Sequence, residues 1–281
     1  MPAYIVCVDI YEKTERFYER VTTEKRVIGK SLFGRKIFAV KIGEGTPVGI
    51  AQYAIHGREF ITAELAFEHF KRGVAAGSFW LIPLLNPDGA LLSQVGLSSV
   101  LGKRAQKRLL SLNGGEDFSL WKANGRGVDL NVNFDAEWGK GKKNVTQAGA
   151  ENYIGTHPFS EPETLALKRF TEEIQPEYTV SYHTKGEEIY WYFYQSMRTC
   201  PRDKRLALVL SQSTGYPLAH ARGSAGGYKD WCVQTLKIPS FTIEAGADRF
   251  SHPIGKEGLN NIIVKNKDAL YALSKEYDFT E

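Results

Sequence analysis

Short apolar runs rich in Val and Ile alternate along the chain with segments whose apolar residues recur at helical spacing. Runs of the first kind indicate strands, and segments of the second kind indicate amphipathic helices. The expected strands cover residues 4–10, 26–31, 36–42, 47–55, 78–85, 178–183 and 240–245. The expected helices cover residues 60–72, 162–174, 203–213 and 258–275. This alternation predicts a single α/β domain with helices on both faces of a largely parallel sheet.

Local signals mark several of the expected boundaries. Residues 33–35 fit a hairpin turn, and residues 86–89 (Asn-Pro-Asp-Gly) fit a turn that closes a buried strand. Ser160 is the expected N-cap of the helix that starts near Pro162. Between residues 113 and 162 glycines are frequent and periodicity is poor. A long irregular segment of this kind in a compact domain indicates a functional role.

Composition argues against several classes of protein. The 281 residues include 36 Lys and Arg against 32 Asp and Glu, which gives a formal net charge of +4. This excess is small and scattered, so no nucleic-acid-binding face is expected. No run of about 18 or more apolar residues occurs, which argues against a membrane span. The three cysteines form no C-x-x-C pair, and the first residues lack a secretory pattern, so a cytoplasmic protein is expected.

Residues suited to metal chemistry fall at or near expected strand ends. His56 follows one strand and precedes Glu59 by three residues, His183 ends another strand, and Glu244 lies in a third. In α/β sheets the carboxyl ends of parallel strands meet at one edge, where sites form. Imidazole and carboxylate are both zinc ligands, and a catalytic zinc site takes three protein ligands. An isolated H-x-x-E pair is a weak signal, and a satisfied buried histidine is the alternative interpretation of His183.

Five motifs, taken in chain order, resemble those of the zinc carboxypeptidase family. They are His56-x-x-Glu59, Asn86-Pro87-Asp88-Gly89, Gly127-Val128-Asp129-Leu130-Asn131-x-Asn133-Phe134, Ser181-Tyr182-His183 and Phe241-Thr242-Ile243-Glu244. The resemblance covers roughly residues 29–248. It implies an α/β/α sandwich around a mixed, largely parallel twisted sheet of about eight strands, in agreement with the alternation of elements.

The resemblance implies a role for each matched residue. His56, Glu59 and His183 correspond to the ligands of one zinc ion per chain. Asp129 corresponds to a carboxylate that accepts a hydrogen bond from His56 and fixes the tautomer of its ring. Glu244 corresponds to the general base, which takes a proton from zinc-activated water and later delivers it to the leaving amine.

Two cations are candidates for polarising the scissile carbonyl. Digestive relatives carry an arginine just after a tryptophan, and here Lys122 follows Trp121 while Arg126 lies nearby. Either cation would stabilise a developing oxyanion, and position favours Lys122. A solvated loop cation is the alternative interpretation of both residues.

The segment that binds the substrate carboxylate departs from the family pattern. Typical carboxypeptidases have Asn-Arg-Asn where this chain has Asn131-Val132-Asn133, so Asn131 is kept and the arginine is missing. Loss of a planar, bidentate carboxylate clamp is not a conservative change. Arg222 occupies the position of the tyrosine that caps the substrate in digestive enzymes, and it is the expected replacement clamp.

Further segments resemble the bacterial branch of the family that cuts the γ-D-glutamyl bond to meso-diaminopimelate in murein peptides. They are Trp121-Lys122-Ala123-Asn124, Glu187-Glu188-Ile189-Tyr190-Trp191 and Gly227-Tyr228-Lys229-Asp230-Trp231. Diaminopimelate carries a carboxylate and an ammonium group at its far end. Arg222 and the pair Glu187 and Glu188 are the expected partners of these two charges.

The expected function is therefore that of a zinc-dependent peptidase acting on murein-derived peptides. A carboxypeptidase of other peptide specificity, an N-acyl amino acid deacylase and a peptide-binding pseudoenzyme are the alternatives. Residues 1–281 are expected to form one catalytic domain without a wall-binding module. Small soluble murein peptides inside the cell are the expected partners, with neither nucleic acid nor membrane involved.

Overall fold

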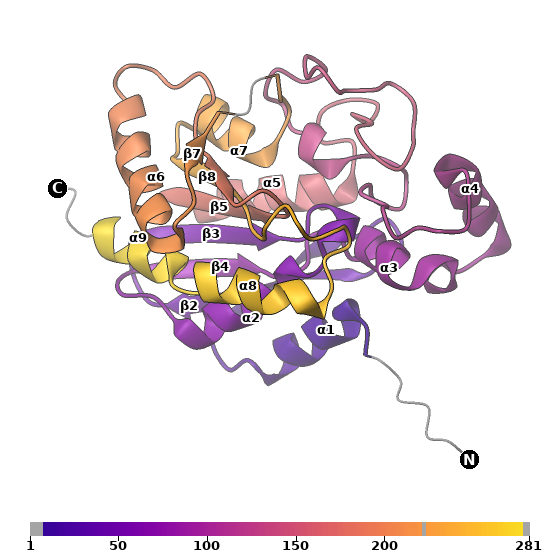
Figure 1. Cartoon of the computed structure of the whole chain (residues 1–281), viewed down its shortest axis with the longest axis horizontal. Coiled ribbons are helices and arrows are strands. Elements are labelled where there is room, and N and C mark those ends of the chain that lie inside the picture. The colour runs from indigo at the N-terminus through magenta and orange to yellow at the C-terminus, as the bar shows by residue number, and fades with distance from the viewer. Residues whose placement is uncertain (1–7, 221–222, 278–281) are drawn as a thin grey trace.

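Eight strands form one mixed sheet through the centre of the molecule (Figure 1). The computed structural model describes residues 8–220 and 223–277. The strands are β1 (Lys25–Lys30), β2 (Lys36–Gly43), β3 (Val48–Tyr53), β4 (Ser78–Ile82), β5 (Tyr178–His183), β6 (Glu188–Tyr190), β7 (Leu218–Ala219) and β8 (Ser240–Glu244). Their order across the sheet is β1-β2-β4-β3-β5-β8-β6-β7. The four central strands β4, β3, β5 and β8 are parallel, and antiparallel pairs flank them, so the expected mixed sheet is confirmed.

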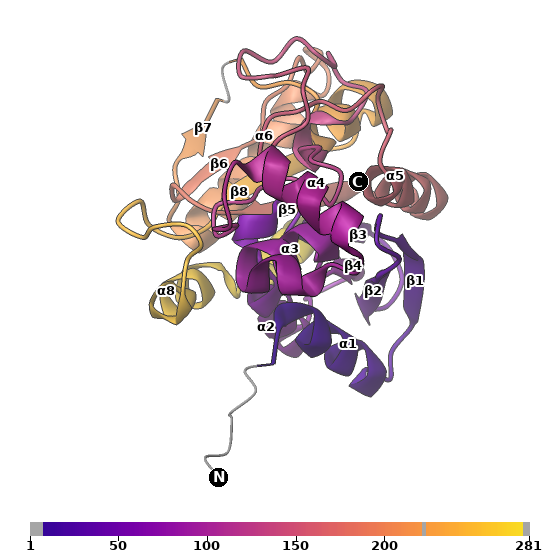
Figure 2. The same ribbon diagram turned by 90° about the vertical axis from the view of Figure 1, so that its right-hand side faces the viewer.

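Helices cover both faces of this sheet, as the turned view also shows (Figure 2). They are α1 (Ile10–Arg20), α2 (Thr62–Arg72), α3 (Pro87–Val95), α4 (Lys103–Asn113), α5 (Pro162–Ile174), α6 (Cys200–Thr214), α7 (Tyr228–Trp231), α8 (Lys256–Asn266) and α9 (Ala269–Tyr277). One core cluster joins the sheet to α2, α6, α8 and α9, and a second joins its other face to α5 and α7. Within the described part of the chain, no helix is both long and apolar enough to cross a bilayer.

The alternation of side chains along β5 decides which face carries the candidate metal ligand. Tyr178, Val180 and Tyr182 belong to the core under α2 and α6. Because successive strand residues point to opposite faces, Ser181 and His183 point to the face covered by α5 and α7. Parallel pairing sets His183 directly beside Glu244 of β8. The sheet therefore brings the two residues together at its carboxyl edge.

The expected strand at residues 4–10 is wrong where the structure describes it. Val8 and Asp9 are not in a strand, and Ile10 begins α1. The side chain of Asp9 accepts a hydrogen bond from the backbone N–H of Glu12 at 2.8 Å, which caps the helix. Ile10, Thr14, Phe17 and Tyr18 follow at helical spacing and face the core, so the sequence held a helix signal that the apolar run obscured.

Other helix boundaries also differ from the expectation. Residues 86–89 are the start of α3 rather than a turn, because Asn86 caps the helix and Pro87 occupies its first position. At α5 the cap position is Glu161, and Ser160 donates its hydroxyl proton to the Glu161 carboxylate instead of capping. The single helix expected over residues 258–275 is two helices, α8 and α9. The long irregular segment between α4 and α5 is confirmed apart from one short 3-10 turn, η3 (Leu130–Val132).

Candidate active site

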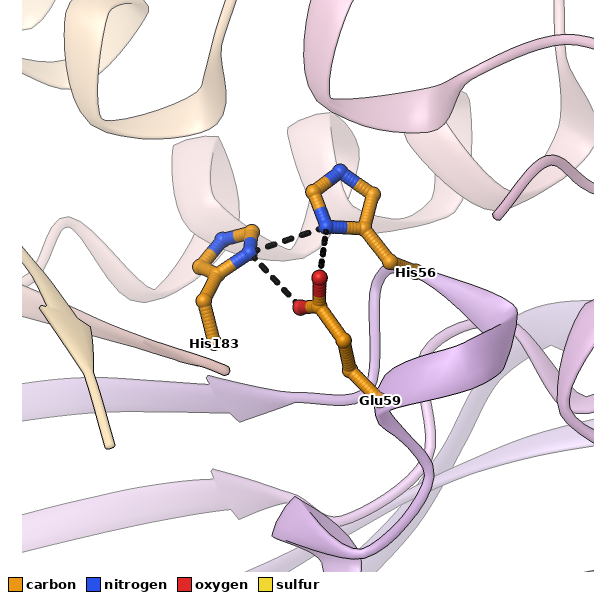
Figure 3. Close-up of side chains that lie close together, drawn as sticks. All are labelled: His56, Glu59 and His183. Carbon is orange, nitrogen blue, oxygen red and sulfur yellow. Dashed lines mark hydrogen bonds and ion pairs between the residues drawn. The ribbon is translucent and has the colours of Figure 1, made fainter. Parts of the chain in front are cut away.

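Three donor side chains converge where β3 and β5 end (Figure 3). His56 lies just after β3, Glu59 ends the 3-10 turn η1 (Gly57–Glu59), and His183 is the last residue of β5. The Nδ1 atoms of His56 and His183 are 3.0 Å apart. Glu59 Oε1 is 3.0 Å from His56 Nδ1, and Glu59 Oε2 is 3.1 Å from His183 Nδ1. All three side chains are buried, so the surrounding protein holds them in place and largely excludes water from them.

The short connection between His56 and Glu59 depends on a close approach of backbones. A Cβ atom at Gly57 would lie 2.4 Å from the carbonyl oxygen of Gly89 and 2.7 Å from that of Trp121. The N–H of Gly57 also donates to the carbonyl oxygen of Lys122 at 2.9 Å. Only glycine fits this contact, which holds the H-x-x-E segment against α3 and the irregular segment.

Behind His56 lies a buried carboxylate with its own cation. His56 Nε2 is 3.2 Å from Asp129 Oδ1, and Asp129 Oδ2 is 2.8 Å from Lys122 Nζ. Burial alone would raise the pKa of Asp129, but Lys122 and His56 outweigh it and hold that pKa well below its usual value. An ionised Asp129 favours the proton of His56 on Nε2, which leaves Nδ1 free to act as a ligand.

This arrangement fits a zinc ion. With the His56 proton on Nε2, its Nδ1 lone pair points at the same place as the Glu59 carboxylate and His183 Nδ1. Glu59 is itself ionised: burial would raise its pKa, but His56 and His183 hold it well below the usual value. Ligand atoms of the three residues lie within 4.8 Å of one another, the one such group found in the described residues. Two imidazoles and one carboxylate, with room for a further ligand, form a common catalytic zinc set.

Glu244 lies beside this group on the neighbouring strand. Its side chain is half-buried and lines the same cavity as His56 and His183. Burial raises the pKa of Glu244 to about 7, an effect that His183 opposes and Glu59 reinforces. A carboxyl group that titrates near neutrality is suited to take up a proton and return it.

The cavity in front of the three donors has a volume of about 480 Å³. Its walls come from the ends of β5, β6 and β8, from the irregular segment and from the residues around α7. The charged and histidine side chains that line it are His56, Lys122, Lys142, Lys143, His183, His220, Lys229, Asp230 and Glu244. Cations therefore outnumber carboxylates on its walls, which favours an anionic ligand.

The two candidates for the carbonyl-polarising cation lie in different surroundings. Lys122 lines the cavity and is only partly exposed. Arg126 is exposed, pairs with Glu161 at 3.0 Å and does not line the cavity. The geometry thus favours Lys122, in agreement with the preference from sequence.

The residues expected to bind substrate charges are only partly brought together. Asn131 lines the cavity, and its Oδ1 accepts a hydrogen bond from the N–H of Tyr228 at 3.1 Å. Glu187 pairs with Lys265 at 2.8 Å, and Glu188 accepts a hydrogen bond from the Tyr190 hydroxyl. Neither glutamate is among the residues that line the cavity. Arg222 lies outside the described residues.

Sequence reasoning missed the charged pair Lys229 and Asp230. The two residues are 5% and 3% exposed, and both line the cavity. Lys229 Nζ lies 2.5 Å from Asp230 Oδ1 and 3.3 Å from the carbonyl oxygen of Tyr192. The available signal was the position of this Lys-Asp pair directly before Trp231, because tryptophan is highly buried on average and neighbouring charges then lie close to the core.

Comparisons with known proteins agree with this site. The model of the zinc carboxypeptidase family matches residues 10–267, so the chain belongs to that family. A γ-D-glutamyl-L-diamino acid endopeptidase of Lysinibacillus sphaericus is 29% identical over 82% of this chain and 62% of its own length. Murein peptide amidase A of Escherichia coli K12 is 30% identical over 46% of this chain and 56% of its own length. The chain therefore spans only about six-tenths of either relative.

Solved structures show the same fold. Bovine thrombin-activatable fibrinolysis inhibitor, in complex with a tick carboxypeptidase inhibitor, superposes with a TM-score of 0.72 at 18% identity. The match covers 95% of this chain and 93% of that one. The murein-tripeptide amidase of Escherichia coli O157 gives a TM-score of 0.59 at 22% identity, with 95% and 97% covered. The α/β/α sandwich expected from the sequence is thereby confirmed.

Proposed function

We propose that this zinc peptidase hydrolyses the γ-D-glutamyl–diaminopimelate amide bond of murein-derived peptides. Two relatives, a γ-D-glutamyl-L-diamino acid endopeptidase and a murein peptide amidase, support a murein peptide as the substrate. The positive balance of the cavity walls supports an anionic substrate. Action inside the cell and the organisation of residues 1–281 as a single catalytic domain stay predictions.

The observation that carries the choice of substrate is the Lys229–Asp230 pair in the cavity wall. Diaminopimelate ends in an amino-acid head with one carboxylate and one ammonium group. Lys229 Nζ has three N–H donors, of which Asp230 and the Tyr192 carbonyl accept two. Among residues 8–220 and 223–277 the third donor has no acceptor, which leaves it for a substrate carboxylate, and Asp230 supplies a negative charge for the ammonium. This pair replaces Glu187 and Glu188 as the best partners for the zwitterion.

Each residue of the site has a defined role in the proposed mechanism. When bound, zinc polarises the scissile carbonyl and lowers the pKa of water. Glu244 accepts a proton from the attacking water and later donates it to the leaving amine. Lys122 stabilises the negative charge that develops on the carbonyl oxygen. Asp129 keeps the His56 proton on Nε2, so that Nδ1 stays a ligand.

Replacing Lys122 by methionine is expected to lower kcat by about 10²–10³-fold, as loss of one oxyanion donor does. Zinc content is expected to stay close to the wild-type level, because Lys122 contacts none of the three ligands and His56 still faces the Asp129 carboxylate. Arg126→Met is the matched control and is expected to change kcat by less than about twofold, since Arg126 does not line the cavity and pairs with the buried Glu161 instead. Steady-state kinetics and elemental analysis check both variants. A large loss of kcat in Arg126→Met alone would assign the carbonyl-polarising role to Arg126 instead of Lys122.

Replacing Lys229 by methionine is expected to remove the preference for diaminopimelate over lysine at the leaving side. A lysyl peptide carries the far ammonium but lacks the far carboxylate, so only the diaminopimelyl peptide loses a partner. A hydrogen bond to a charged group contributes about 1.5–3 kcal/mol, so the ratio of kcat/KM values should fall about tenfold or more. Equal losses on the two peptides would mean that Lys229 does not contact that carboxylate.

The function itself is tested with zinc-loaded protein and L-Ala-γ-D-Glu-meso-diaminopimelate, with products identified by mass spectrometry. We expect free diaminopimelate and the dipeptide L-Ala-D-Glu. An N-acyl amino acid and an ordinary α-linked peptide are incubated in parallel, because they represent a deacylase and a carboxypeptidase of other specificity. Cleavage of either one without cleavage of the murein peptide would refute the proposal.

A further inference from the structure

One rim of the catalytic cavity carries two lysines for which the described part of the chain offers no ion-pair partner. Lys142 and Lys143 line the cavity and belong to the irregular segment. The other two lysines of the cavity are paired, Lys122 with Asp129 and Lys229 with Asp230. Within the described residues neither Lys142 nor Lys143 takes part in an ion pair. The rim is therefore where the positive charge of the cavity is not balanced.

Lys142 is held in place although its side chain is exposed. Its N–H donates to the carbonyl oxygen of Gly223 at 2.8 Å. A Cβ atom at Gly223 would lie 2.7 Å from Lys142 Cδ and 3.1 Å from Lys142 Cε, so the lysine stem lies directly along that glycine. Gly223 has a φ of +82°, a conformation that favours glycine. The facing wall of the cavity thus positions the Lys142 stem.

Asn144, two residues after Lys142, supplies a hydrogen-bond donor to the same rim. Asn144 lines the same cavity, and its Nδ2 is buried without a hydrogen-bond partner in the part of the chain that the structure describes. Its side chain packs against Gly141, where an added Cβ would lie 2.6 Å from Asn144 Oδ1. A buried donor without an acceptor is costly, and an oxygen of a bound ligand would satisfy it.

We propose that Lys142, Lys143 and Asn144 form an anion-binding rim that takes a carboxylate of the peptide substrate. Two ammonium groups and one amide N–H supply charge-assisted hydrogen bonds of the kind that carboxylates accept. The inference rests on the proposed function, because a murein tripeptide has two carboxylates besides the one assigned to Lys229. One is the α-carboxylate of the γ-linked glutamyl residue, and the other is the carboxylate of diaminopimelate next to the scissile amide.

The test compares three peptides on the chain with and without the rim lysines. The peptides are the tripeptide, its analogue with a glutamyl α-carboxamide, and its analogue with a carboxamide next to the scissile bond. The proteins are the zinc-loaded chain and its double variant Lys142→Gln with Lys143→Gln. Dissociation constants are measured by calorimetry in a Glu244→Gln background, which prevents turnover, and kcat/KM is measured without that substitution. The double variant is expected to bind the tripeptide about tenfold more weakly or worse.

The double variant is expected to show no such loss with the peptide whose rim carboxylate has been amidated, and this identifies the carboxylate that the rim binds. Lys140→Gln is the matched control on the same loop, because Lys140 pairs with Glu137 and does not line the catalytic cavity. The proposed rim would be refuted if the double variant lost affinity equally for all three peptides or lost none. It would also be refuted if no peptide bound measurably. Binding that depends on the rim without cleavage would refute the proposed function alone.

Discussion

Replacing Glu244 by glutamine is expected to lower kcat on the murein tripeptide by about 10²–10⁴-fold. The amide cannot accept a proton from water, while its size and shape are nearly those of the carboxylate. Glu244 is half-buried beside His183 on the paired strand, and no ion pair with it is found among the described residues. We therefore expect zinc content and the midpoint of thermal unfolding to stay close to wild type, which separates loss of chemistry from loss of structure.

The control for this variant is Glu187→Gln, which changes a nearby carboxylate in the turn between β5 and β6. The Glu187 side chain pairs with Lys265, and only its backbone N–H contacts Glu244, at the carbonyl oxygen. A partly exposed ion pair contributes little, so we expect less than about a twofold change in kcat. Near-native turnover in Glu244→Gln would assign the base to another residue. A large loss of turnover in Glu187→Gln would restore that residue as a partner of the substrate.

The central strands and the convergence of the site were predictable from the sequence for the same reason. The strand predicted over residues 178–183 is β5, whose residues are all buried. A polar residue at the C-terminal end of a buried parallel strand lies at the carboxyl edge of the sheet. His183 and Glu244 therefore carried a positional signal before any contact was known.

The walls of the cavity could not be predicted in this way. Lys142 and Asn144 lie in an irregular segment, and Lys229 lies in α7, a helix of only one turn. None of these segments has a period that fixes a direction for its side chains, and all of them are far from His56 in the chain. Glu187 and Glu188 were expected at the substrate because their segment resembles the murein-cleaving branch of the family and their charge suits the far ammonium group of diaminopimelate. The turn before β6 directs Glu187 toward Lys265 instead.

The helices that were missed show a second limit. α1 and α3 both begin with a capping side chain, Asp9 and Asn86. The apolar run before α1 favours a strand, and the Asn-Pro-Asp-Gly sequence at the start of α3 favours a turn. A helix cap contributes only about 1 kcal/mol. A short helix is therefore stable only when its apolar face also packs against the rest of the protein. Phe17 and Ile10 have that surface in the folded chain, where both pack against the core.

Replacing His183 by alanine is expected to abolish stoichiometric zinc binding. Removal of this imidazole leaves His56 and Glu59 as the remaining donors of the group. It also removes the partner of Glu59 Oε2, which lies 3.1 Å from His183 Nδ1, so the buried charge of Glu59 is less well compensated. Elemental analysis after dialysis should give about one zinc per wild-type chain and far less than one per variant chain.

A second measurement makes this result independent of activity. A ligand that binds only the folded state raises its stability, so added zinc should raise the unfolding midpoint of the wild type but not that of His183→Ala. His157→Ala is the matched control, because His157 lies in an exposed loop where its Nδ1 faces the carbonyl oxygen of Pro158. It should behave as wild type in both measurements. A His183→Ala protein that still held one tightly bound zinc ion would show that the metal lies elsewhere, and the roles inferred for Asp129 and Glu244 would fall with it.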